Sequence, residues 1–399
     1  MNKKDLIYLD YNSTTPVDPV VLDKMLPYFH DISGNAASRS HPFGWVAEEA
    51  VDHARQKIAH LINVEAKEIV FTSGATEGDN LILKGIYEMY YRKGNHIITL
   101  ETEHKAVLDA CEKIEKQGGE VTYLKVDNNG LVNLNELESA ITDKTILVSI
   151  IWANNETGVI QPMKKIGEIC DRKGVLLMSD ATQAIGKIPV SPKEVGVHLL
   201  AFSAHKMYGP KGVGAIYVCG KNPRVKLTAQ MDGGGHERGM RSGTLNVPGI
   251  VGFAAAAELL RSTVREESKR VKKLRDRLES ELLTIEESFV NGQDAERLDH
   301  VCNISFRFVE SEALIATFNQ TIAVSTGSAC TSASLDPSHV LIGMGLSEDM
   351  AYSSIRFSLG RYTTIEEIER TIELVKKGVQ KLRDMSPIWE MFKEGIDVT

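Results

Sequence analysis

The sequence predicts an α/β protein with a mostly parallel central sheet flanked by helices and a second, smaller α/β domain. Strand-like and helix-like segments alternate from about Lys67 to Val218, which favours a parallel sheet with helices on both faces. After Pro248 the pattern changes to one long helical run over 249–283, with an apolar stripe along one side. Beyond this run the smaller domain is predicted from strands at 302–308 and 355–359 and from helices at 312–319 and 365–383.

The composition sets limits on the class of protein. Of 399 residues, 42% are hydrophobic and 25% charged, as in an ordinary folded domain, and the length favours two or three domains. A formal charge of −8 disfavours a general binder of nucleic acid or of an anionic membrane. The longest apolar stretch, Pro248–Leu260, is too short to span a bilayer. With no leader in front of the first strand and no disulfide pattern among the cysteines, we expect a cytoplasmic location and no membrane contact.

Two of the predicted strands end in residues that suit one cofactor. The strand over 199–202 is followed by Ser203, His205 and Lys206, and an earlier strand over 175–178 leads into Asp180. Open α/β sheets bind ligands at the carboxyl ends of their strands. A lysine can form a Schiff base with pyridoxal 5′-phosphate (PLP), and a carboxylate can keep the pyridine nitrogen protonated. Each residue alone would be a solvated lysine or a helix cap, but the pair favours PLP.

Three further strand ends support this interpretation. The turn over 72–77 after the strand at 68–71 has the small residues of a phosphate site at a helix N-terminus, and the helix is expected over 80–91. The turn matches neither ATP-binding nor NAD-binding motifs. His104 follows the strand at 96–100, where it could stack on a ring or move a proton. Asn155 follows the apolar strand at 146–152, where its amide could bond a cofactor oxygen or a substrate carboxylate.

Seven motifs extend the argument to a family. They are TSGATE, TEHKAVL, NNETG, DATQ, SAHKMYGPKG, GGGHERGMRSGTLN and STGSACTSAS. In this order they resemble those of cysteine desulfurases of the iron–sulfur-cluster assembly type (IscS/NifS-like, group I), which are fold-type I PLP enzymes of aminotransferase class V. The resemblance runs from Tyr8 to about Trp389. It implies a large PLP-binding domain over 16–262 and a small domain made of 1–15 and 263–399.

The resemblance also implies roles for individual residues. Lys206, His104 and Cys330 are the expected catalytic residues. Substrate contacts are expected from Asn35, Asn155 and Arg356, whose guanidinium would grip the α-carboxylate of L-cysteine. The expected PLP-binding residues are Ala75, Thr76, His104, Asn155, Asp180, Gln183, Ser203, His205, Lys206 and Thr244, the last reaching the phosphate across the interface of a homodimer.

The five cysteines differ in their surroundings. Cys111, Cys170 and Cys302 lie on apolar stripes and are predicted core residues, and Cys219 ends a strand. Cys330 lies in a run of small residues with no core pattern, where an exposed thiol could react as the thiolate. By resemblance, Cys330 receives sulfur from L-cysteine as a persulfide, leaving L-alanine.

The resemblance implies partners as well. Sulfur would pass from Cys330 to an iron–sulfur scaffold protein and other acceptors, for cluster assembly and for tRNA thiolation, without direct contact with nucleic acid. Cys330 would serve as a transient ligand of a [2Fe–2S] cluster shared with the scaffold. The C-terminus is short beside the longest relatives, which makes scaffold docking less secure than catalysis.

Other functions fit the same residues. A selenocysteine lyase or a cysteine-sulfinate desulfinase would use the same sheet without needing an acceptor thiol. An aminotransferase would need a 2-oxo acid and show ping-pong kinetics. A non-catalytic assembly partner would bind no PLP and would lack its yellow colour.

Overall fold

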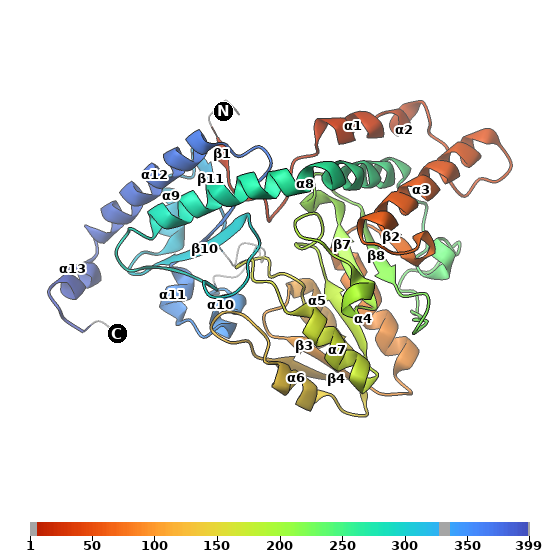
Figure 1. Cartoon of the computed structure of the whole chain (residues 1–399), viewed down its shortest axis with the longest axis horizontal. Coiled ribbons are helices and arrows are strands. Elements are labelled where there is room, and N and C mark those ends of the chain that lie inside the picture. The colour runs from red at the N-terminus through yellow and green to blue at the C-terminus, as the bar shows by residue number, and fades with distance from the viewer. Residues whose placement is uncertain (1–5, 327–335, 398–399) are drawn as a thin grey trace.

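The computed structural model describes residues 6–326 and 336–397. The largest element of this part of the chain is a seven-stranded sheet (Figure 1). In spatial order its strands are β2 (Ile69–Thr72), β8 (Gly214–Val218), β7 (Leu199–Ser203), β6 (Leu176–Asp180), β5 (Thr145–Ser149), β3 (His96–Leu100) and β4 (Glu120–Leu124).

Strand β8 alone runs against its neighbours in this sheet. It pairs antiparallel with both β2 and β7, so β2 and β7 point the same way, and the remaining pairs are parallel. The prediction of a mostly parallel sheet is therefore confirmed. Because β2, β3, β5, β6 and β7 share one direction, the loops that follow them meet at one edge of the sheet.

Helices cover both faces of the sheet. A Cβ atom on Gly78 of α4 (Ala75–Tyr90) would lie 3.1 Å from Cβ of Ala201, whereas the ring of the next residue, Phe202, packs 5.7 Å from the ring of Phe253 on α8 (Val247–Leu282). Successive residues of a strand point to opposite faces, so α4 and α8 lie on opposite sides. The other helices of this part are α1 (Pro19–Met25), α2 (Pro27–His30), α3 (Pro42–Leu61), α5 (Lys105–Glu115), α6 (Leu134–Ala140) and α7 (Met163–Lys173).

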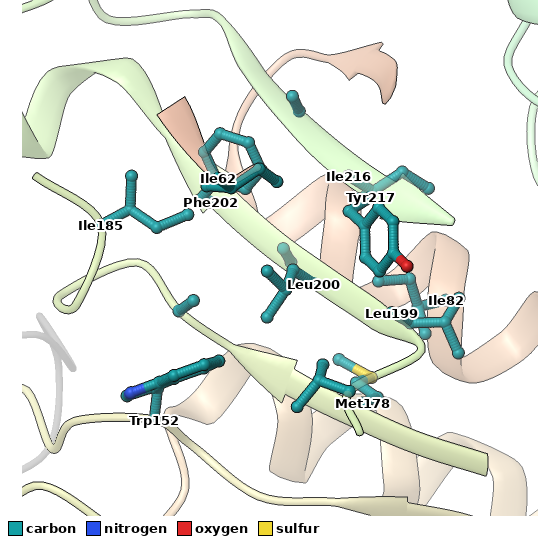
Figure 2. Packing of buried hydrophobic residues seen from close by; sticks show 14 of the residues in the cluster. Ile62, Ile82, Trp152, Met178, Ile185, Leu199, Leu200, Phe202, Ile216 and Tyr217 are labelled. Atoms are coloured by element: carbon teal, nitrogen blue, oxygen red, sulfur yellow. The ribbon is translucent and has the colours of Figure 1, made fainter. Parts of the chain in front are cut away.

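The large hydrophobic core lies between the sheet and these helices (Figure 2). Phe202 and Leu200 of β7 and Tyr217 of β8 are almost completely buried in it. Cys111 and Cys170 also belong to this core, as expected, and burial raises the pKa of each thiol to about 12. These two cysteines are therefore packing residues rather than nucleophiles.

Helix α8 connects the large core with a second one. Its residues up to Leu260 pack in the large core, and from Val271 onward its apolar side chains pack in the second core. By length and composition α8 is the one helix in the described ranges that could cross a membrane, but 56% of its most apolar window is buried inside the protein. That burial is what a core helix shared by two packing units requires.

The second core is built on smaller sheets. An antiparallel sheet has the order β12 (Ser354–Ser358), β10 (Val301–Phe306) and β9 (Ser288–Val290), and β1 (Ile7–Tyr8) pairs parallel with β11 (Ile322–Ala323). Ile7 and Leu9 from the N-terminal segment pack in this core, as does Cys302. Helices α9 (Ser311–Ala316) and α12 (Ile365–Arg383) pack in this core, whereas α10 (His339–Gly343) and α11 (Glu348–Tyr352) pack around a separate small cluster and α13 (Pro387–Lys393) has no buried residue.

Helix α12 illustrates why these elements form where they do. Thr364 and Glu367 form a capping box, in which each side chain accepts a hydrogen bond from the other residue's backbone N–H. The apolar positions then recur at helical spacing and are buried: Ile368, Ile372, Val375 and Val379. Helix α12 begins and ends where the sequence pattern predicted.

Candidate active site

A cavity of about 380 Å³ lies at the edge where the parallel strands end. Its walls come from the loops after β2, β3, β5, β6 and β7, together with the N-terminal segment and β12. The predicted site residues that line it are Ala75, Thr76, His104, Asn155, Asp180, Gln183, Ser203, His205, Lys206 and Arg356. Predicted residues as far apart in the sequence as Ala75 and Arg356 thus share one cavity.

Lys206 and Asp180 occupy adjacent strand ends. Asp180 is the last residue of β6, and Lys206 ends the short 3₁₀ helix (Ala204–Lys206) that follows β7. The Lys206 ammonium donates hydrogen bonds to the backbone oxygens of Asn12, at 2.6 Å, and Ser13, at 2.8 Å. The Asp180 carboxylate accepts one from the backbone N–H of Thr182 at 2.9 Å. A primary amine and a carboxylate therefore both border the cavity, as PLP requires.

The N-terminus of α4 lines one side of this cavity. The helix begins at Ala75, five residues earlier than expected, and its N-cap Gly74 makes no side-chain capping bond, so backbone N–H groups of the first turn can serve an anion. Position 214 on β8 packs so closely against this turn that it admits only glycine, because a Cβ atom on Gly214 would lie 2.7 Å from Cα of Gly74.

His205 also lines the cavity and is uncharged at neutral pH. Burial and the charges of Lys206 and Lys211 lower its pKa to about 4. Its Nδ1 atom lies 3.1 Å from the hydroxyl of Thr14, which fixes the ring against the N-terminal segment. His205 can therefore offer a neutral hydrogen-bonding group to the cavity without adding charge.

His104 is the N-cap of α5. Its Nδ1 atom accepts a hydrogen bond from the backbone N–H of Ala106 at 3.1 Å, so in the neutral ring the proton is assigned to Nε2. Burial lowers the pKa of His104; the charge of Asp180 opposes this shift and that of Lys206 adds to it. His104 is therefore neutral at pH 7, with one nitrogen held by the backbone.

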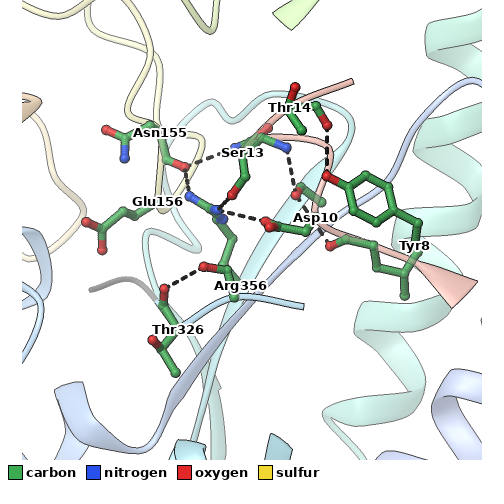
Figure 3. A network of polar contacts seen from close by, with 12 residues as sticks. Tyr8, Asp10, Ser13, Thr14, Asn155, Glu156, Thr326 and Arg356 are labelled. Carbon is green, nitrogen blue, oxygen red and sulfur yellow. Dashed lines mark hydrogen bonds and ion pairs between the residues drawn. The ribbon is translucent and has the colours of Figure 1, made fainter. Parts of the chain in front are cut away.

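Arg356 is the centre of a buried polar network (Figure 3). Its guanidinium donates to the backbone oxygen of Asn155, the carboxylate of Asp10 and the hydroxyl of Ser13, each at 2.9 Å. The side chain is 1% exposed, and these three acceptors fix its plane. Within the described residues, Nε of Arg356 and Oδ1 of Asn155 are buried without a hydrogen-bond partner. One donor, Nε of Arg356, and one acceptor, Oδ1 of Asn155, are thus left to hydrogen-bond a ligand next to the cavity.

Three buried acids near the site escaped the sequence analysis. Glu103 accepts a hydrogen bond from the backbone N–H of Ile151 at 2.6 Å, which ties the loop carrying His104 to the loop carrying Asn155. Burial raises the pKa of Glu103 and of Asp79, and the charge of Asp180 adds to both shifts. Burial also raises the pKa of Glu156 to about 7, against the hydroxyl of Ser338 and the charge of Arg356. No sequence pattern around these three acids distinguishes them from acids that cap a helix or lie on the surface.

Three of the predicted site residues are not among those that line the cavity. Asn35 and Thr244 are exposed, and the Asn35 side chain accepts a hydrogen bond from the backbone of Ala37. Cys330 falls outside the described residues. Their roles stay predictions. The described residues contain no group of three or more His, Cys, Asp or Glu side chains that could hold a metal ion.

The cavity also has lining residues that were not predicted. They are Asn12, Ser73, Gly74, Glu77, Ile151, Thr182, Lys211 and Gly212. Gly74, Glu77 and Thr182 directly adjoin a predicted residue along the chain. Asn12 does not, and its only signal was its place just after Tyr8, where the family resemblance begins.

Comparison with known proteins assigns the family. The Aminotransferase class-V model matches residues 7–371. The chain belongs to this family. It is 57% identical over 396 residues to the cysteine desulfurase IscS of Glaesserella parasuis serovar 5, covering 98% of this chain and 97% of that protein. It is 54% identical over 395 residues, with the same coverage, to the cysteine desulfurase IscS of Pectobacterium carotovorum.

Solved structures agree with this assignment. A NifS-like protein shares 38% identity with a TM-score of 0.87, covering 94% of this chain and 99% of that one. The NifS-like protein of Rickettsia africae shares 32% identity with a TM-score of 0.85 and the same coverage. The chain is therefore a cysteine desulfurase of the IscS/NifS type, and the resemblance seen in its motifs is confirmed.

Proposed function

We propose that the cavity binds PLP on Lys206 and that the chain uses it to move sulfur from L-cysteine to Cys330, releasing L-alanine. The observation that carries this proposal is the shared cavity of Lys206, Asp180 and the uncapped N-terminus of α4. An amine, a carboxylate and a phosphate cradle are the three groups that a flat, phosphorylated aldehyde needs.

The residues present fit PLP. Gly214 lets the backbone of Gly74, the N-cap of α4, pack closely against β8, because a Cβ atom on Gly214 would lie 2.7 Å from Cα of Gly74. Asp180 supplies the negative charge for the ring nitrogen, and the unpartnered Oδ1 of Asn155 is a further polar contact. When bound, PLP acts as an electron sink that weakens bonds at the substrate's carbon atoms.

Each protein residue then has a task. Lys206 holds the cofactor and, once released from it, moves the proton of the substrate's α-carbon. Arg356, oriented by Asp10, Ser13 and Asn155, binds the substrate carboxylate. His104 adjusts the protonation of the substrate thiol. Asn35 assists at the substrate.

Cys330 accepts the sulfur. The carbon–sulfur bond of L-cysteine breaks, a sulfur–sulfur bond forms at Cys330, and protons from the thiols end on alanine and on the persulfide. L-Cysteine and a protein thiol together contain the atoms and electrons of L-alanine and a protein persulfide, so no external oxidant is needed. A solved relative of 33% identity, with a TM-score of 0.79, is titled SspA in complex with cysteine, which supports the choice of substrate.

The persulfide then needs an acceptor. We propose that sulfur passes in the cytoplasm to an iron–sulfur scaffold protein, with which Cys330 transiently shares a [2Fe–2S] cluster, and to acceptors for tRNA thiolation. The name IscS of the curated relatives supports the first of these routes.

A homodimer is part of the proposal. Large apolar side chains are exposed on α1, α2 and the start of α3, among them Phe29 and Phe43, each 61% exposed. A second copy of the chain is the partner that would cover them and bring Thr244 to its neighbour's phosphate. The boundaries of the large domain (16–262) and of the small domain (1–15 and 263–399) are proposed with the dimer, since α8 passes from one core to the other between Leu260 and Val271.

One experiment tests the function as a whole. Purified protein should be yellow and, with L-cysteine and a thiol reductant, should form alanine and sulfide in equal amounts. A colourless protein that takes up no PLP would show a non-catalytic assembly partner. Sedimentation should show a dimer, and an active monomer with bound cofactor would contradict the proposed role of Thr244.

A further inference from the structure

The start of helix α10 is attached to two loops of the active site. The hydroxyl of Ser338 donates a hydrogen bond to Oε2 of Glu156 at 2.5 Å. The Nε2 atom of His339 bonds the backbone oxygen of Glu103 at 2.9 Å. Glu156 and Ser338 are 3% and 4% exposed, so the bond between them is shielded from water.

Both loops carry residues of the site. Glu156 follows Asn155, whose backbone oxygen accepts from Arg356, and Glu103 precedes His104. On the other side of the sequence that contains Cys330, the backbone N–H of Arg356 donates to the oxygen of Ser325 at 2.8 Å. The described residues on both sides of Cys330 are therefore hydrogen-bonded to segments that carry residues of the cavity wall.

Glu156 is itself held in place. Its backbone N–H donates to the side chain of Asn154 at 2.9 Å, and its backbone oxygen accepts from Asn303 at 3.3 Å. Its side chain does not line the cavity, so the proposed chemistry gives it no direct role. Burying a carboxyl group is costly unless its hydrogen bonds are made, and the hydroxyl of Ser338 donates one to this side chain.

We propose that Glu156 is a positioning residue for the sulfur-transfer step, acting through Ser338 to hold the start of α10, which follows Cys330 in the sequence. The inference rests on the proposed role of Cys330 as the sulfur acceptor. It assigns to this pair an effect on sulfur transfer, and none on the binding of PLP or of L-cysteine.

Four single variants of the PLP-loaded protein and one double variant separate this role from a structural one. Glu156→Gln weakens the acceptor at nearly constant size, and Ser338→Ala removes the donor. Ser338 also caps α10 through the N–H of Leu341, so Ser347→Ala, which removes the cap of the equally short α11, is the matched control. Ser338→Thr restores a hydroxyl and a cap.

The measurement is the rate at which the peptide containing Cys330 gains sulfur in a single turnover, together with the cofactor absorbance and KM for L-cysteine. We expect Ser338→Ala to slow sulfur gain by about 10-fold, as for the loss of one buried hydrogen bond, and Glu156→Gln, which keeps a weaker acceptor, to slow it by less, with absorbance and KM unchanged in both. The double variant should lose no more than Ser338→Ala alone, because both changes act on the same bond. Ser347→Ala and Ser338→Thr should behave like the wild type.

Other outcomes have distinct meanings. Wild-type protein that gains sulfur at another residue would overturn the proposed function itself. Sulfur gain at Cys330 with the wild-type rate in Ser338→Ala would leave the function intact and overturn this inference. An equal loss in Ser347→Ala would also overturn it, since helix capping alone would then explain the effect. If Glu156→Gln does not fold, the three serine variants still test whether the hydroxyl of Ser338 affects the rate of sulfur gain.

Discussion

The Nζ atom of Lys206 lies 2.6 Å from the backbone oxygen of Asn12, although 194 positions separate the two residues. The neighbouring Ser13 accepts from Lys206 through its backbone oxygen and from Arg356 through its hydroxyl. The segment Asn12–Ser13 therefore joins the residue proposed to hold the cofactor with the residue proposed to bind the substrate carboxylate. These contacts fix the distance between Lys206 and Arg356.

Replacing Lys206 with alanine should abolish both turnover and the absorbance of lysine-bound PLP, because the proposed Schiff base needs its amine. Lys187 provides the control, since burial lowers its pKa to about 8 but its side chain does not line the cavity. Lys187→Ala should keep the absorbance. Visible spectra of both purified variants check this, and full activity in Lys206→Ala would refute the assignment.

Arg356→Lys keeps the charge but loses the planar fork that three acceptors orient. We expect KM for L-cysteine to rise about 10- to 100-fold, as for the loss of a hydrogen bond to a charged group. Arg297, which forms a partly buried two-bond pair with Glu279 outside the cavity, provides the control Arg297→Lys. Steady-state kinetics that show no rise for Arg356→Lys, or the same rise for both variants, would argue against carboxylate binding.

The sequence predicted the sheet and most of the cavity because the signals were local. Each strand that feeds the site is a short apolar run, and Asp180, His104 and Asn155 follow such runs directly. The contact of Asn12 with Lys206 was not predicted, because nothing local to Asn12 indicates which distant side chain it meets. The antiparallel direction of β8 likewise follows from the short turn after Lys206 rather than from the strand's own composition.

The buried acids could not be predicted either. Asp79 lies on α4 among residues that read as an ordinary amphipathic helix, and its burial depends on how α4 packs on the sheet. Glu103 and Glu156 lie in loops, where an acid is usually exposed. The roles of Asn35 and Thr244 remain predictions, since the proposed partner subunit would complete their surroundings.

Activity should decrease in acid as His104 becomes charged. Its pKa lies below the ordinary value of 6.5, so the neutral form dominates at pH 7 and is lost as the pH falls through the lowered pKa. Rates measured between about pH 5 and 8 should show this acid limb in the wild type and not in His104→Gln. His198→Gln is the matched control, because His198 also has a lowered pKa and accepts a backbone N–H, yet lies away from the cavity. An unchanged acid limb in His104→Gln would exclude His104 as its origin.

Asp79→Asn should stabilise the protein, and more so at higher pH. Both carboxyl oxygens of Asp79 are buried without a partner, and the pKa is raised by burial and by the charges of Asp180 and Glu103. In the wild type, stability is fully present below the ordinary pKa of 3.8 and falls as the pH rises towards the folded-state pKa, by up to about 1.4 kcal/mol per pH unit. Thermal unfolding at pH 5 and pH 8 should therefore show the larger gain at pH 8; a gain that is equal at both values would mean that Asp79 is not protonated on folding.

The identity of the residue that receives the sulfur tests the whole account most directly. After brief exposure of the wild-type protein to L-cysteine, mass spectrometry of its peptides should find one added sulfur atom on the peptide that contains Cys330. Cys330→Ser should keep the cofactor absorbance and gain no sulfur, because a hydroxyl cannot form a persulfide. Added sulfur on the peptides of Cys111, Cys170, Cys219 or Cys302 instead, or undiminished sulfide release by Cys330→Ser, would contradict the account.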